Sequence, residues 1–271
     1  TDLDLPDPDE HRGNAIRGSR LGRCARQSAY MLYPDLFPPA PLPARAKLVF
    51  RFGDMIHDLI RAEFRRVLKG EFGMEEEPFH FAVPLSHAEA KAAMAKFVSG
   101  HLRGRLLREG SAAPLLRGLV LDESQPCLYV PIRPDGIADL SDAGLGLATI
   151  EIKSMATGSF RRALQGEVDY SYRVQMAVEV EAAGLDTHVY VSVRKDTCHL
   201  LEVLYTKRAA TVEVRFTKSS RLVEVIRAAG GNPEDAADWE GAEVRHPFEP
   251  ALLDHARARV RRILLAEPDQ L

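Results

Sequence analysis

Four short runs of β-forming residues stand close together in the middle of the chain, and they restrict the possible folds more than any other feature. Turn residues such as Asp142 and Gly144 separate them, so neighbouring runs are joined by short connections. Short connections favour antiparallel pairing. We therefore expect a meander of antiparallel strands at 119–123, 127–132, 136–140 and 147–153.

Helical patterns flank these strands on both sides. The strongest covers 44–69, where apolar residues recur at helical spacing. A second helix is expected at 169–183, ended by Gly184, and it leads into a strand at 188–193. This order favours an α/β or α+β fold with a mixed sheet. The remaining expected elements are helices at 18–33, 87–109, 208–229 and 250–267, an edge strand at 79–84 and a strand at 199–205.

A chain of 271 residues can form one domain with a sizeable core. The first residues are rich in Asp and Pro, so we expect a loose tail at 1–17. A single domain is expected at 18–271, with its core at about 44–205 and C-terminal helices at 206–271.

Composition excludes several classes of protein. A hydrophobic share of 45% is too high for a disordered chain, and no apolar run approaches the roughly 18 residues that cross a bilayer. The first residues lack the basic-then-apolar order of a signal peptide. Three well-separated cysteines, Cys24, Cys127 and Cys198, form no disulfide framework, which favours a reduced, cytoplasmic compartment. With a formal charge of −3, contacts with nucleic acid would have to come from local basic patches.

The run at 147–153 carries charged side chains in a pattern that suggests chemistry. Side chains alternate between the faces of a strand, so Thr149, Glu151 and Lys153 share one face, while Ile150 and Ile152 pack on the core side. A carboxylate and an ammonium group then stand about 6–7 Å apart, measured between Cα atoms. Taken alone, such a pair usually belongs to a solvated strand face.

Asp135 changes that interpretation. A hairpin would bring Asp135 beside Glu151, and two converging carboxylates repel each other unless a cation lies between them. Mg²⁺ and similar ions prefer oxygen ligands, and Lys153 beside such an ion can position water and stabilise phosphate charge. Asp135, Glu151 and Lys153 are therefore a minimum set for metal-assisted hydrolysis of a phosphodiester.

The same residues resemble those of a known enzyme superfamily. Pro-Asp-Gly at 134–136, followed by Ile-Glu-Ile-Lys-Ser at 150–154, is similar to the motif of the PD-(D/E)xK nucleases. Four further segments resemble the RecB-type and lambda-exonuclease-like branch of that superfamily. They are the helix motif Gly53-x-x-x-His57, the helix motif with Tyr172 and Gln175, a strand ending in Lys195-Asp196-Thr197, and the opening Ser19-x-x-x-x-Cys24-x-Arg26.

The resemblance implies a fold, an activity and a set of residues. The fold is α/β, with a restriction-endonuclease-like α-β-β-β-α-β core, a mixed sheet and additional N- and C-terminal helices. The activity is that of a DNA nuclease that uses Mg²⁺ or Mn²⁺, with Asp135, Glu151 and Lys153 as catalytic residues. The metal ligands would be His57, Asp135, Glu151 and the backbone carbonyl of Ile152. DNA would be contacted by Arg20, Arg23, Arg26, Arg161, Tyr172, Gln175 and Lys195.

Some positions compete within the pattern or depart from it. Asp139 also fits the aspartate motif, but it lies four strand residues, about 13 Å, from Asp135, so both cannot ligate one ion with Glu151. Asp135 is favoured because a glycine follows it and allows close approach. Glu179 stands where many relatives have a tyrosine. Relatives with an iron–sulfur cluster have an early cysteine, matched by Cys24, and three late ones that this sequence lacks, so no cluster is expected.

The expected function is therefore exonucleolytic cleavage of DNA to a 5′-phosphate product, in recombination, repair or a phage-like system. A structure-selective or nicking endonuclease is one alternative, and a non-catalytic nucleic-acid-binding subunit of the same fold is another. The sequence has no phosphate-binding loop of an ATPase, so a helicase or recombination partner would be a separate chain. No membrane partner is expected.

Overall fold

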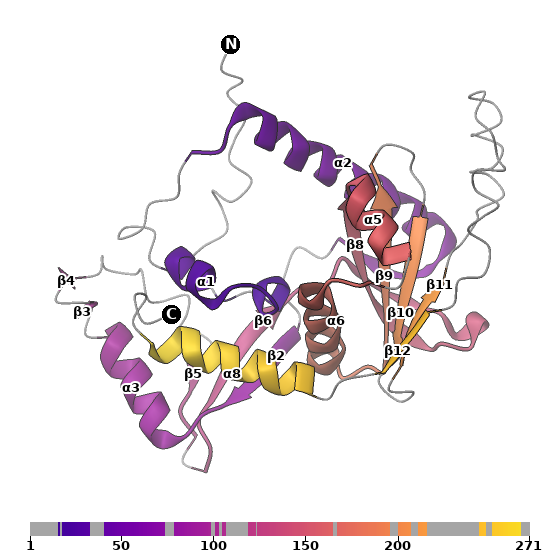
Figure 1. Ribbon diagram of the computed structural model, residues 1–271. Helices are drawn as coiled ribbons and strands as arrows, with labels where there is room; N and C mark the ends of the chain where they lie inside the picture. Colours follow the sequence, from indigo (N-terminus) through magenta and orange to yellow (C-terminus); the bar gives the residue numbers. More distant parts are fainter. Residues whose placement is uncertain are drawn as a thin grey trace, which may run out of the picture.

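The computed structural model has an α/β fold built around a mixed sheet, with helices on both faces (Figure 1). It describes residues 16, 18–32, 41–73, 79–98, 101–102, 105–106, 119–122, 124–164, 167–195, 200–206, 211–215, 244–247 and 251–266.

The helical elements include two short 3-10 turns. In chain order they are η1 (Gly18–Arg20), α1 (Ala25–Leu32), α2 (Ala44–Val67), α3 (His87–Val98), η2 (Ser141–Ala143), α5 (Thr157–Leu164), α6 (Tyr170–Ala183) and α8 (Ala251–Leu265). The strands are β1 (Lys69–Phe72), β2 (Phe79–Pro84), β3 (His101–Leu102), β4 (Arg105–Leu106), β5 (Leu119–Val120), β6 (Cys127–Ile132), β7 (Gly136–Asp139), β8 (Leu147–Met155), β9 (Thr187–Arg194), β10 (Leu200–Thr206), β11 (Thr211–Arg215) and β12 (Val244–Pro247).

The main sheet has the strand order β1-β7-β8-β9-β10-β11-β12. Strands β8 and β9 are parallel, and the other neighbours are antiparallel. Helices α5 and α6 lie between β8 and β9 in the chain, and they supply the long crossover that parallel neighbours require. The sheet is therefore mixed, as expected from the sequence.

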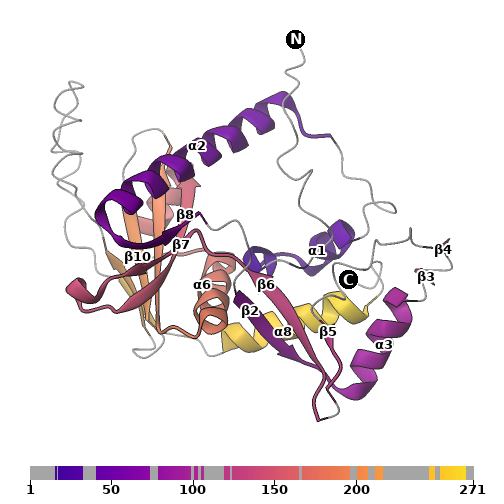
Figure 2. The same cartoon turned by 180° about the vertical axis from the view of Figure 1, so that it is seen from behind.

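Helices α2 and α6 cover opposite faces of this sheet, as Figures 1 and 2 show from front and back. Ile56 of α2 is buried together with Ile150 and Ile152 of β8. On the other face, Tyr190 of β9 packs in the core cluster that contains Val174 of α6. The alternation expected for the central strand is confirmed, and the face with the charged residues lies under α6.

One expected pairing is wrong. Strand β6 does not join β7 in a single meander; it pairs with β2 and β5 in a separate three-stranded sheet. Pro134 lies in the link between β6 and β7, where it lacks the N–H that a strand ladder needs. The apolar residues of β6 instead face the core beside those of β2, including Phe81, Val83, Leu128 and Val130.

Other boundaries also differ from the expected ones. The helix expected at 87–109 ends at Val98, and β3 and β4 follow, since Gly100 and Gly104 are poor helix formers. The region 206–271 is not purely helical, because β11 has the alternation of a strand and pairs with β10 and β12. Ile16, placed in the expected tail, is buried in the core. The rest of that tail, and 216–229, lie outside the described residues.

Further differences concern short elements. The helix expected at 18–33 is divided into η1 and α1. Helix α2, expected to extend to residue 69, ends at Val67, and β1 begins at Lys69. Helix α5 was not expected from the sequence. Within the described ranges, no helix is long and apolar enough to cross a membrane.

Candidate active site

Strands β7 and β8 differ in length, and this difference creates a place for Asp135. Gly136, the first residue of β7, pairs with Ile150, so Ile152 lies beyond the end of β7. The side chain of Asp135 occupies that position, and its Oδ2 accepts a hydrogen bond from the Ile152 N–H at 2.7 Å. The carboxylate is thereby held at the edge of the strand that carries Glu151. A residue's C=O points to the same side of a strand as its N–H, so the Ile152 carbonyl faces this edge too.

Two residues of α2 contact the same carboxylate. Arg61 donates a hydrogen bond to Asp135 Oδ1, and His57 Nδ1 lies 3.5 Å from Asp135 Oδ2. Burial alone would raise the pKa of Asp135, but the hydrogen bonds and charges of His57 and Arg61 outweigh it, so the pKa lies below its ordinary value. The structure therefore holds Asp135 as an ionised carboxylate.

Helix α2 approaches β8 closely at Gly53. A Cβ atom at this position would lie 3.2 Å from the hydroxyl oxygen of Ser154, which is tighter than most contacts of its kind. Gly53 therefore lets the helix lie near the strand. His57 and Arg61 follow at intervals of four residues, so all three share one face of the helix.

Glu151 and Lys153 form a partly buried ion pair on the face of β8 that is turned away from α2. Lys153 Nζ donates a hydrogen bond to Glu151 Oε1, and the two side chains are 6% and 23% exposed, Glu151 being the more buried. Burial raises the pKa of Glu151 more than the charge of Lys153 lowers it, and the charge of Asp135 raises it further. Burial would lower the pKa of Lys153, but the Glu151 carboxylate more than offsets this, and the pKa is raised. Lys153 is thus an ammonium ion.

A buried polar network continues from Glu151 beneath α6. Gln175 lies close enough to Glu151 to lower its pKa, and its Nε2 donates a hydrogen bond to Glu179 Oε1 at 2.7 Å. Glu179 Oε2 lies 3.4 Å from His188 Nδ1, which is also 2.8 Å from the Thr149 hydroxyl. Burial, followed by the charge of Glu151, raises the pKa of Glu179 well above its ordinary value. The sequence did not reveal this network, although Glu179 was noted as a departure from the tyrosine of many relatives.

Because of this buried network, we expect the folded protein to lose stability as the pH falls. His188 is fully buried, and its burial, with the charge of Lys153, lowers its pKa to about 3. Between pH 6.5 and 3 the unfolded chain takes up a proton here and the folded protein does not. Neutral His188 therefore contributes its full stabilisation at pH values above the pKa of histidine in the unfolded chain. This stabilisation is lost as the pH falls below that pKa. We expect about 2 kcal/mol of unfolding free energy to be lost between pH 7 and pH 5 through this residue.

Urea unfolding at both pH values measures this loss, and a His188→Asn variant is the comparison. An amide stays neutral, so the variant is expected to lose about 2 kcal/mol less than the natural protein over the same interval. Equal losses in the two proteins would contradict a neutral, buried His188.

The residues that were expected to contact DNA differ in how far their side chains are exposed to solvent. Arg23 and Arg161 are exposed, Tyr172 is half-buried against Tyr190, and Lys195 is half-buried with its N–H bonded to the Met155 carbonyl at 3.0 Å. Gln175 differs from the others: it is 4% exposed and engaged in the buried network, so its side chain does not reach the surface.

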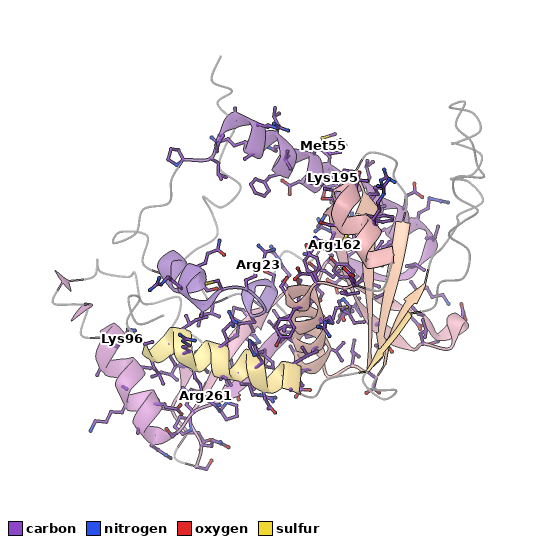
Figure 3. The ribbon with its side chains drawn as sticks, in the orientation of Figure 1. Arg23, Met55, Lys96, Arg162, Lys195 and Arg261 are labelled. Carbon is purple, nitrogen blue, oxygen red and sulfur yellow. The ribbon has the colours of Figure 1, made fainter. Side chains whose placement is uncertain are left out.

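The structure says less about Arg20 and Arg26, the other two arginines of the first helical segment that were expected to contact DNA. Arg26 is exposed and already has an interaction partner, and the side chain of Arg20 lies outside the described residues. Gly22 lies against the first turn of α6, because a Cβ there would meet Ser171 Cα at 2.3 Å. Figure 3 shows Arg23, the next residue, in the region between α1 and α5.

Asp139 lies at the far end of β7 from Asp135. It is exposed, and its Oδ1 accepts a hydrogen bond from Ser141 N at 3.0 Å. The Ser141 hydroxyl and backbone hydrogen bonds lower its pKa. Asp139 therefore has a local explanation in the turn, whereas Asp135 contacts two distant elements.

Besides the Glu179–His188 network, two further residues of the site were not predicted from the sequence. Arg61 lies one helical turn after His57, and that spacing was the available signal. Tyr190 is the register partner of Glu151 on β9, and only the parallel pairing reveals this. Of the three cysteines, Cys24 and Cys127 are free and Cys198 lies outside the described ranges.

As the side chains stand, no group of three His, Cys, Asp or Glu residues in the described part of the chain is arranged to hold a metal ion. Asp135 is turned to Arg61 and the Ile152 N–H, and Glu151 is turned to Lys153 and Gln175. A bound dication would have to compete with Arg61 and Lys153 for these carboxylates.

Comparisons with known proteins do not identify the chain. No family model and no curated protein matches it. Among solved structures it is similar to the crystal structure of SSO0001, with 13% sequence identity and a TM-score of 0.38, over 89% of this chain and 82% of that one. A similarity of this size does not bear on function.

Proposed function

We propose that the protein is a metal-dependent DNA nuclease of the PD-(D/E)xK superfamily. The observation that carries the proposal is the meeting of Asp135 with the Glu151–Lys153 strand where β7 ends, with His57 beside Asp135. Carboxylates and a lysine gathered around one strand suit the cleavage of a charged phosphodiester.

The arrangement of elements supports the proposal. When the elements inserted between them are left aside, α2, β1, β7, β8, α6 and β9 follow one another in the order α-β-β-β-α-β, and this order supports the assignment of a restriction-endonuclease-like core. These four strands are neighbours in the sheet, and β8 and β9 are parallel. In this proposed core the first strand is β1, whereas the sequence placed all three strands between 119 and 153.

The donor set fits Mg²⁺ or Mn²⁺. Asp135 and Glu151 are buried carboxylates, each raising the electrostatic cost of the other's charge, and a dication relieves such a pair. Asp135, Glu151, His57 and the Ile152 carbonyl would hold the ion, with no iron–sulfur cluster. When bound, the ion would supply Lewis-acid activation of water and of the phosphate.

The chain's own residues would share the remaining work. Lys153 is a partly buried cation that can stabilise charge developing on the phosphate. Asp135 is held ionised, and the Ile152 N–H fixes its Oδ2, so its negative charge is available to a cation at this place. Exposed arginines such as Arg23 and Arg161 would contact backbone phosphates without reading sequence. We favour exonuclease action over a nicking endonuclease and over a non-catalytic binding subunit, and a helicase or recombination partner would be a separate chain.

Incubation with linear and circular duplex DNA tests the proposal. We expect linear DNA to be degraded and circular DNA to survive, faster with Mn²⁺ than with Mg²⁺, because imidazole suits Mn²⁺ better. EDTA should stop the reaction. A Glu151→Gln protein, purified in the same way, excludes a contaminating nuclease. Cleavage of circular DNA would select the endonuclease, and no cleavage of either substrate would favour the binding subunit and contradict the proposal.

A further inference from the structure

A cavity of about 250 Å³ lies beside the candidate active site, between β8, α5 and the first turn of α6. Met155 and Tyr190 line it. Met155 lies two residues, about 7 Å, beyond Lys153 on the same face of β8, and Tyr190 is the register partner of Glu151. The cavity is therefore next to the Glu151–Lys153 ion pair, on the same face of the sheet.

One side of the cavity is aromatic. The rings of Tyr172 and Tyr190, both lining residues, have centroids 5.3 Å apart and planes inclined by 36°. Met155 adds a polarisable thioether to this surface. Flat aromatic surfaces with one partly exposed ring are typical of sites at which a planar ligand stacks.

The Tyr190 hydroxyl has no hydrogen-bond partner among the described residues, although the side chain is 1% exposed. The hydroxyls of Ser192 and Tyr172 lie near enough to affect its pKa, but neither has the geometry of a hydrogen bond with it. Buried polar groups in folded proteins almost always have partners, so an unpaired one calls for an explanation. A ligand in the cavity that Tyr190 lines would supply the missing partner.

The rim of the cavity is polar and carries both signs of charge. Arg162 and Ser159 come from α5, and Glu167 follows that helix. Arg162 is exposed, and Figure 3 shows it on the side of α5 towards α6. A guanidinium suits a phosphate, while a hydroxyl and a carboxylate match the donors and acceptors on the edge of a nucleobase.

We propose that this cavity receives one unpaired nucleobase of the DNA strand being cut, stacked on Tyr172, with the adjoining phosphate on Arg162. The inference rests on the proposed nuclease function and extends it to the substrate. The combination of an aromatic wall, edge-recognising polar groups and a neighbouring cation matches a nucleotide. The volume of about 250 Å³ accommodates one base, and stacking on Tyr172 requires a base face that is free of its neighbours, so the strand would be unpaired there.

Binding in EDTA tests the proposal without cleavage. The probes are single-stranded oligonucleotides with one 2-aminopurine at successive positions, and matched oligonucleotides with an abasic residue at the same positions. We expect one position to change its fluorescence on binding. Removing the base there should weaken binding about 5-fold to 100-fold. Equal affinity for every abasic oligonucleotide would overturn the proposal.

Two variants of the cavity and one control variant locate the effect. Tyr172→Ala should abolish the fluorescence response and bind the natural and abasic oligonucleotides equally, whereas Tyr129→Ala, an exposed tyrosine on β6, should behave like the natural protein. Tyr190→Phe removes only the unpaired hydroxyl, so it should fold with unchanged or higher stability yet bind the base-containing oligonucleotide more weakly. Unchanged binding by Tyr190→Phe would overturn the assignment of its hydroxyl to the ligand.

The outcomes separate this inference from the proposed function. Position-dependent binding without Mn²⁺-dependent cleavage would retain the cavity as a base site and overturn the nuclease. Cleavage with no position dependence would retain the nuclease and overturn the base site.

Discussion

Replacement of Lys153 by alanine is expected to slow DNA cleavage by about a thousandfold or more. The structure keeps Lys153 charged, because the Glu151 carboxylate raises its pKa despite burial. A fixed cation in a partly buried site stabilises charge in the transition state far more than a solvated one, so its loss should lower kcat. Single-turnover cleavage of linear DNA, with Mn²⁺ and enzyme in excess, measures the effect on the chemical step.

The same substitution should also affect folding, since Glu151 then loses its ion-pair partner. A buried carboxylate without a partner is destabilising, and protonation limits the loss, so we expect about 1–3 kcal/mol. Lys153→Met keeps the apolar stem and should be nearly as inactive. Lys91→Ala, on the exposed surface of α3, is the control and should retain activity and stability. A folded Lys153→Met protein with normal activity would remove Lys153 from the catalytic residues.

The local pattern of β8 allowed a large part of this site to be predicted from sequence. Alternation along one strand places Glu151 and Lys153 on one face and Ile150 and Ile152 on the other, and it requires no knowledge of distant residues. The position of Asp135 beside β8 followed from the short hairpin. These features depend on local geometry, which sequence patterns describe well.

Features that depend on distant parts of the chain could not be predicted. Arg61 reaches Asp135 from a helix 74 residues earlier, and Tyr190 reaches the face of Glu151 through parallel pairing. The pairing of β6 with β2 replaced the expected meander for the same reason. Gln175 has a familiar motif position, but its burial with Glu179 and His188 makes it part of the interior.

Replacement of Asp135 by asparagine should abolish metal-dependent cleavage and strongly reduce Mn²⁺ affinity. The amide keeps the shape of the side chain but loses the charge that Arg61 and His57 recognise and that would attract a dication. We expect cleavage to fall at least about a hundredfold, and heat of Mn²⁺ binding to disappear in calorimetry without DNA. Calorimetry separates loss of metal from loss of DNA contact.

Asp139→Asn is the matched control for this substitution. Both variants exchange one carboxylate for an amide, at opposite ends of β7, but Asp139 is exposed and contacts only the adjacent turn in its described hydrogen bonds. The Asp139→Asn protein should cleave DNA at a rate within about threefold of that of the natural protein.

The free energy of unfolding should distinguish Asp135→Asn from Asp139→Asn as well. The pKa of Asp135 is lowered, so its contribution exists above the unfolded pKa and is lost as the pH falls through the folded one. Unfolding at neutral pH should therefore show a deficit for Asp135→Asn that shrinks in acid. An inactive Asp139→Asn beside an active Asp135→Asn would reverse the assignment of the catalytic aspartate.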